Sequence, residues 1–203
     1  MGLVAENAGI VVGVDETGST AIDGQGTWSA ADARPYILLA TDKYTAYRRQ
    51  MDIPHEIAHL VLHRHVKDED LERHFSLIER QAWILAGAFL LPHRAFAAEI
   101  PSLSLDGFLS LKRRWMVSVG AMIMRAETLE TLSPYAAELL WRYRAAKGWH
   151  RKEPFDLPER NTGRAALPTQ AMRRNDHWRR GPLKKSFAGN GHRARCGRRG
   201  DAC

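Results

Sequence analysis

Residues 54–63 place the strongest constraint on how this chain can fold. Their sequence predicts a helix, and 3.6 residues per turn put His55 and His59 one above the other on one face. The apolar residues 60–62 that follow predict that this helix is buried. Buried imidazoles need polar partners or a metal ion, so the fold must bring such a group to this face.

The motif His-Glu-x-x-His at residues 55–59 is typical of zinc hydrolases. His55 and His59 can reach one Zn²⁺ at metal–nitrogen distances of about 2.0–2.1 Å. Glu56 lies about 100° further round the helix, where a general base can take a proton from water. We predict Zn²⁺ as the cofactor, two histidine ligands and Glu56 as the catalytic base. The alternative is a helical domain without metal, in which both histidines make ordinary hydrogen bonds.

A catalytic zinc site needs a third protein ligand, and three residues are candidates. His65 has the metzincin spacing from His59, but Leu62 stands where that pattern requires glycine, so the helix continues and His65 points away. His63 lies about 6 Å further along the axis, too far for the same ion, and is expected beside the ligands or exposed. Glu79 follows on a second predicted helix, as in gluzincins, and completes a His₂Glu set. We predict Glu79.

The remaining patterns predict an α+β fold in which a short, mostly antiparallel sheet lies against core helices. Residues 67–73 are expected to form a charged, exposed connection. Pro54 leaves two possibilities, because either Asp52 caps a new helix or the helix kinks before His55. The predicted strands are 10–14, a short one near 27–28, and 34–40, and the predicted helices are 3–7, 42–64, 76–91, 105–115, 117–126 and 133–147.

The net charge of +7 is unevenly distributed over the 203 residues. Residues 161–203 hold eleven Arg and Lys against two Asp, a net +9, which leaves residues 1–160 at −2. Both cysteines, Cys196 and Cys203, lie in this tail, which fits a reducing compartment. Without a signal peptide or a long apolar run, we expect a cytoplasmic protein with no membrane association.

Three parts are expected along the chain. Residues 1–100 form a zinc metallopeptidase core, 101–157 a helical extension with a helix-turn-helix-like pair, and 158–203 a basic, disordered tail. The pair at 105–126 could contact DNA, but its apolar residues favour a packing role. The tail could bind nucleic acid electrostatically, although we do not favour that role.

Two ordered motifs resemble a known family. Residues 49–63 resemble the metal helix of the ImmA/IrrE metallo-endopeptidases. Residues 79–92, which begin with Glu79 and end in Leu-Leu-Pro, are similar to the second signature of that family. Residues 108–125, with 148–149 and 153–154, resemble its longer members, in which a helix-turn-helix repressor-type domain precedes the peptidase. The resemblance covers roughly residues 9–157.

The resemblance implies a small thermolysin-like (gluzincin) peptidase that cleaves a helix-turn-helix repressor to relieve repression. By position, His55, His59 and Glu79 would hold zinc and Glu56 would be the base. Pro54 and Trp83 depart from the family pattern, since the position of Trp83 usually holds Asn or His.

The chain also begins close to its first strand, so a truncated gene product that lacks the preceding helix and any DNA-binding domain is one interpretation. The alternative function is a weak or inactive peptidase-like regulator that binds DNA or a repressor partner.

Overall fold

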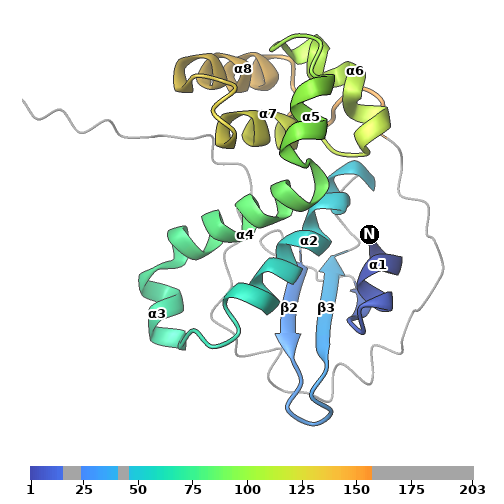
Figure 1. The fold of residues 1–203 in the computed structure, drawn as a ribbon, viewed down its shortest axis with the longest axis vertical. Helices are drawn as coiled ribbons and strands as arrows, with labels where there is room; N and C mark the ends of the chain where they lie inside the picture. The colour runs from blue at the N-terminus through green and yellow to red at the C-terminus, as the bar shows by residue number, and fades with distance from the viewer. Residues whose placement is uncertain (16–23, 41–45, 157–203) are drawn as a thin grey trace, which may run out of the picture.

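The computed structural model describes residues 1–15, 24–40 and 46–156, which form an α+β fold (Figure 1). The basic tail predicted at 158–203, with both cysteines, lies outside the described residues, as do residues 42–45 of the predicted metal helix. The strands are β1 (Val11–Asp15), β2 (Gly24–Trp28) and β3 (Pro35–Ala40), and the helices are α1 (Gly2–Asn7), α2 (Ala46–Leu62), α3 (Asp68–Arg73), α4 (Phe75–Leu90), α5 (His93–Glu99), α6 (Leu105–Trp115), α7 (Val119–Thr128) and α8 (Pro134–Ala146).

The sheet is mixed, so the prediction of a mostly antiparallel sheet is wrong for one of its two strand pairs. The strand order is β1-β3-β2, in which β1 pairs with β3 in parallel and β2 pairs with β3 antiparallel. After β2 the chain turns back as a hairpin, so that β3 lies between β1 and β2 and runs antiparallel to β2. In this position β3 runs parallel to β1. Ile37 and Leu39 of this central strand are buried, as its run of apolar residues predicts.

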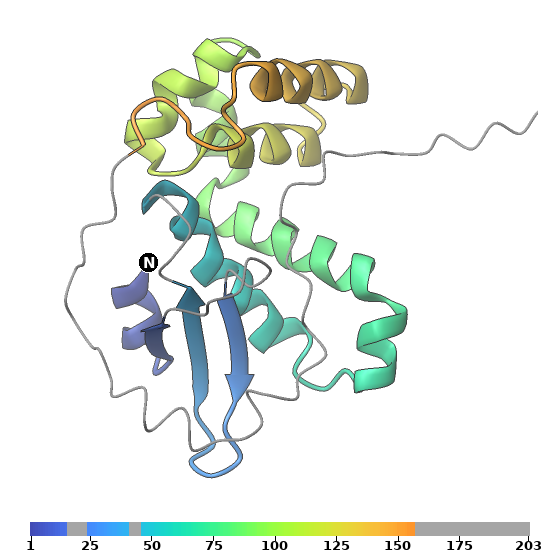
Figure 2. The same cartoon turned by 180° about the vertical axis from the view of Figure 1, so that it is seen from behind.

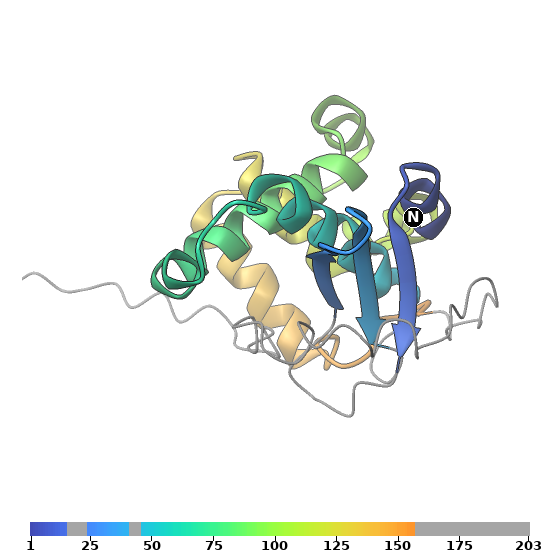
Figure 3. The same cartoon turned by 90° about the horizontal axis from the view of Figure 1, so that it is seen from below.

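Helix α2 lies between the sheet and α4 (Figures 1 and 3). Its Ile53 and Leu60 pack with Ile37 and Leu39 of β3 in a small core beneath the sheet. Pro54 stands inside this single helix, so the alternative in which Asp52 caps a new helix is not realised. Proline cannot donate a backbone hydrogen bond, and packing of α2 on both sides holds the helix together at that point.

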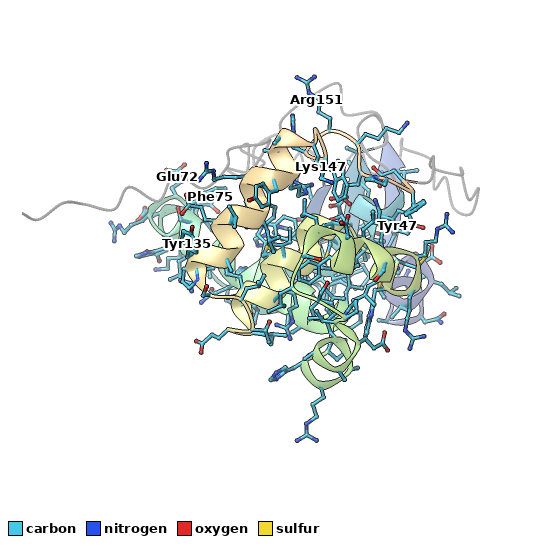
Figure 4. The ribbon with its side chains drawn as sticks, turned by 90° about the horizontal axis from the view of Figure 1, so that it is seen from above. Tyr47, Glu72, Phe75, Tyr135, Lys147 and Arg151 are labelled. Carbon is cyan, nitrogen blue, oxygen red and sulfur yellow. The ribbon has the colours of Figure 1, made fainter. Side chains whose placement is uncertain are left out.

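Helices α5–α8 form a group stacked on one end of α2 and α4 (Figure 2). Seen from above, α8 crosses the top of the molecule from Tyr135 near its start to Lys147 just after its end (Figure 4). The Ser118 and Ser133 side chains accept hydrogen bonds from the backbone amides of α7 and α8, so each caps the start of its helix. Met51 of α2 belongs to the same apolar cluster as this helical group, so one core joins α2 to α5–α8.

The helix-turn-helix-like pair consists of α6 and α7, and its apolar side chains pack inward. Val119, Met122 and Ile123 have no solvent-exposed surface, and Leu109 and Trp115 pack against the same cluster. These contacts agree with the packing interpretation of the pair.

A buried carboxylate holds the segment after α8 against this helical group. Glu153 accepts hydrogen bonds from the backbone amides of Val119 and Gly120 at the start of α7. It also pairs with Lys112 Nζ at 3.0 Å and with the Arg144 guanidinium. A carboxylate at a helix N-terminus is stabilised by the helix dipole, so this segment is a structural part of the fold.

Two segments differ from the sequence predictions. Residues 68–73, expected as a connection, form α3, which buries none of its residues. Its Asp68, Glu69 and Asp70 occupy the first turn, where acidic residues are favoured. The prediction missed this helix because it has no apolar residues repeating at helical spacing. Helix α5 was not predicted.

Within the described residues, no helix is both long and apolar enough to cross a membrane.

Candidate metal centre

The three predicted ligands come together from two helices. His55 and His59 face outward from α2 toward α4, which carries Glu79 in its second turn. Helices α2 and α4 pack against each other. Ala58 on α2 and Ala82 on α4 are completely buried, and Ala82 lies one helical turn after Glu79, on the same face. The predicted arrangement of Glu79 opposite the histidines is therefore present.

The three ligand side chains form a triangle, in which the two histidines face different oxygens of the Glu79 carboxylate. The Nε2 atoms of His55 and His59 lie 3.0 Å apart. His55 Nε2 is 3.4 Å from Glu79 Oε2, and His59 Nε2 is 3.3 Å from Glu79 Oε1. Tetrahedral ligands at about 2.0–2.2 Å from a zinc ion stand about 3.3–3.6 Å from one another. The three side chains therefore stand close to the spacing that a tetrahedral metal ion requires, with adjustments of the Nε2–Nε2 distance and of the carboxylate orientation.

The charges of these groups attract a cation. Burial alone would raise the pKa of Glu79, but hydrogen bonds from His55 and His59, with their positive charges, lower it to about 2. Burial works to lower the pKa of His59, but its hydrogen bond to Glu79 and the charges of Glu56 and Glu79 raise it overall. The raised pKa of His59 and the lowered pKa of Glu79 show that this site favours positive charge beside the carboxylate.

Glu56 lies beside this triangle and belongs to a different contact. Its side chain is buried against β2, at the position of two glycines in alternate residues, Gly24 and Gly26. A Cβ atom at Gly24 would lie 3.3 Å from Glu56 Oε1, and one at Gly26 would lie 3.2 Å from Glu56 Oε2. Only glycines leave room for the carboxylate at this distance from the strand.

The surroundings of Glu56 favour its proton-bound form more than water does. Burial raises its pKa, the charges of His55 and His59 lower it, the charge of Glu79 raises it, and a hydrogen bond from the Gly26 backbone lowers it. The net pKa is raised. A carboxyl group whose pKa is raised toward neutrality is suited to accept and release a proton in one reaction cycle.

Sequence reasoning missed Gly24 and Gly26. The signal that could have found them is their spacing, because glycines two residues apart in a strand share one face and often mark the close approach of another group. Strand β2 is held in place at its end, where Trp28 Nε1 donates a hydrogen bond to the Leu60 backbone oxygen at 3.1 Å. This bond fixes β2 against the helix that carries Glu56.

The other two candidate histidines, His63 and His65, occupy different environments. His63 is buried and lies 3.1 Å from His59, measured between their Nδ1 atoms. It also lies 3.0 Å from Gln81 of α4, measured from its Nε2 atom to Gln81 Oε1. This agrees with the expectation that His63 stands beside the ligands. His65 is exposed, as predicted, but the reason given for it is wrong. The helix does not continue past Leu62, because α2 ends at that residue and residues 63–65 form a bend and a turn.

The surroundings of His55 are less polar. Its Nδ1 atom is buried and has no hydrogen-bond partner within the described part of the chain. The Trp83 ring lies against it, with centroids 4.2 Å apart. Indole can donate a hydrogen bond but cannot accept one. Trp83 therefore cannot take the Nδ1 proton that a metal-binding His55 would present.

Two histidines one helical turn apart, a carboxylate from a second helix and a buried glutamate beside them define the site class as that of a metallopeptidase. The family model described as the IrrE N-terminal-like domain, of the M78 peptidases, matches residues 5–127. The chain therefore belongs to this family, which confirms its resemblance to the ImmA/IrrE proteins. No curated protein matches the chain significantly.

Proposed function

We propose that the chain is a zinc-dependent endopeptidase. In this proposal His55, His59 and Glu79 are the zinc ligands and Glu56 is the general base. The observation that carries it is the size of the ligand triangle, with edges of 3.0, 3.3 and 3.4 Å. The family match supports a peptidase, and the His₂Glu donor set is the combination found in catalytic zinc sites that keep a position open.

Zinc held there would supply a Lewis acid that polarises the scissile carbonyl and lowers the pKa of water toward about 7. Glu56 then accepts the water proton and transfers it to the leaving amine. The Gly26 backbone hydrogen bond orients the Glu56 carboxylate, and the two β2 glycines keep it next to the strand. Burial of Glu56 limits competing exchange of its proton with solvent.

The sheet edge beside the site supports a peptide substrate. Among the described residues, β2 pairs only with β3. Figures 1 and 2 show that β2 lies nearer than β3 to α4, which carries Glu79. An unpaired strand edge can bind an extended peptide through backbone hydrogen bonds. We propose a helix-turn-helix repressor as the protein substrate because of the resemblance of the two motifs to the ImmA/IrrE family.

A second candidate is a regulator with weak or no peptidase activity. The contact of Trp83 with His55 favours it, because His55 Nδ1 lacks the partner that a metal-binding histidine normally has. Such a protein would act by binding a repressor or DNA. The apolar residues of the helical pair α6–α7 pack inward, so they are not available to contact DNA.

Zinc content and cleavage separate these candidates. We expect about one zinc per chain by elemental mass spectrometry, lost in His59→Ala. Glu56→Gln should keep the zinc and lose cleavage of a candidate repressor, while the same change at exposed Glu72 should alter neither. Folded protein without zinc would refute the metal site, and cleavage by Glu56→Gln would refute the role of Glu56.

A further inference from the structure

A chain of three side chains extends from the metal centre to the surface of α4. His59 Nδ1 lies 3.1 Å from His63 Nδ1, and His63 Nε2 lies 3.0 Å from Gln81 Oε1. His63 directly follows α2 and continues its backbone pattern, since its amide donates to the His59 carbonyl at 3.0 Å. His63 as a whole is 9% exposed, so its ring nitrogens depend on these neighbours for hydrogen bonds.

Once His59 binds a metal, the donors and acceptors among His59, His63 and Gln81 can be assigned in only one way. The Nε2 atom of His59 faces His55 and Glu79, so it must be free of a proton when it acts as a ligand. The proton then resides on His59 Nδ1, and His63 Nδ1 must accept it. A neutral His63 in turn carries its proton on Nε2, which donates to Gln81 Oε1.

The histidine on the other side has no such support. His55 Nδ1 is buried without a partner in the described chain, and Trp83 occupies the space beside it. A metal-binding histidine normally donates its second N–H to an outer partner, which fixes the ring orientation and raises its basicity. In this site only His59 has that partner.

We propose that His63, supported by Gln81, is a positioning residue that fixes the tautomer and ring orientation of His59 and thereby maintains metal affinity. The inference rests on the proposed metal site and identifies which outer contact this site depends on. It differs from a packing role because it requires an acceptor atom at the Nδ1 position of His63.

Two substitutions of similar shape separate these roles. His63→Asn keeps an acceptor oxygen close to the position of Nδ1, whereas His63→Leu fills the same space without one. Both remove the bond to Gln81 equally. His65→Leu, at an exposed histidine two residues further on, controls for the loss of an imidazole near the site.

The measurement is zinc affinity of the full chain, by competition with a chromophoric chelator, together with the absorption spectrum of the cobalt-substituted protein. Circular dichroism verifies that each variant is folded. We expect His63→Leu to bind zinc about 10–100-fold more weakly and to alter the cobalt spectrum. His63→Asn should recover most of the affinity, and His65→Leu should match the wild type.

The outcomes distinguish this inference from the proposed function. If the wild type binds zinc and His63→Leu binds it equally well, the positioning role is refuted while the metal site stands. If His63→Asn is as weak as His63→Leu, the acceptor argument is refuted and packing explains the loss. If the wild type binds no zinc, the metal site fails and the positioning role fails with it.

Discussion

Replacing Gly26 by alanine tests whether the Glu56 side chain packs as closely against the glycines of β2 as the structure indicates. We call this contact of Glu56 with Gly24 and Gly26 the glycine seat of Glu56. The added Cβ would lie 3.2 Å from three atoms at once: the Glu56 backbone oxygen, Glu56 Oε2 and Leu60 Cγ. Ordinary contacts begin at about 3.4–3.5 Å, so each neighbour must move by a few tenths of an ångström. The backbone oxygen belongs to α2 and cannot rotate away.

Gly24 provides the matched comparison. Its Cβ would meet Leu39 Cδ2 at 3.2 Å and Glu56 Cγ and Oε1 at 3.3 Å, all of them side-chain atoms that can shift. The strand cannot simply retreat, because Trp28 is hydrogen-bonded to the Leu60 carbonyl.

The expected magnitude follows from two opposing effects. Overpacking a filled site costs about 1–3 kcal/mol, while replacing glycine by alanine inside a strand gains roughly 0.5–1 kcal/mol. The two effects together give a loss of about 0–2.5 kcal/mol in the free energy of unfolding. Because one of the three contacts at Gly26 is a backbone atom, Gly26→Ala should lie in the upper part of this range, at about 1–2 kcal/mol, and Gly24→Ala should change the stability less. Gly26→Ala should also reduce cleavage by displacing Glu56, because small misplacements of reacting groups are costly. Zinc content should be unaffected, since neither glycine contacts the ligand triangle.

Urea unfolding followed by circular dichroism measures both variants against the wild type under one set of conditions. The reasoning is refuted if Gly26→Ala is as stable as the wild type, or if Gly24→Ala is the more damaged of the two. Loss of zinc in Gly26→Ala would show that the seat of Glu56 and the metal centre are not separate.

Two further predictions concern metal binding. Because the pKa of His59 is raised in the metal-free protein, zinc must displace a proton there, so the apparent affinity should fall as the pH drops through that raised pKa. Glu79, with a pKa of about 2, stays ionised throughout. Chelator competition between about pH 8 and 6 measures this, and a flat profile would contradict it. Trp83→His should give His55 Nδ1 an acceptor and tighten zinc binding by about tenfold or more, whereas Trp83→Phe should not; equal affinities in both variants would show that this partner is unimportant.

The elements with strong local signals were predictable. Helices α2 and α4 have apolar residues at helical spacing, and the β-branched run at 10–14 gives β1. Helix α3 was missed because it buries none of its residues, so it has no apolar face from which to recognise it. The parallel pairing of β1 with β3 depends on where the hairpin inserts, and no local pattern encodes that position.

By itself, the sequence determined which groups of the candidate site share one helix face. The spacing of His55 and His59 is local and follows from 3.6 residues per turn, and Glu79 followed from its place on a second helix. Only the tertiary structure decided what surrounds these groups, such as the glycine seat of Glu56, the contact of His63 with Gln81 and the unpartnered His55 Nδ1. These contacts join elements far apart in the chain. They depend on how the elements pack, because helical periodicity orients a side chain but does not specify what it will meet.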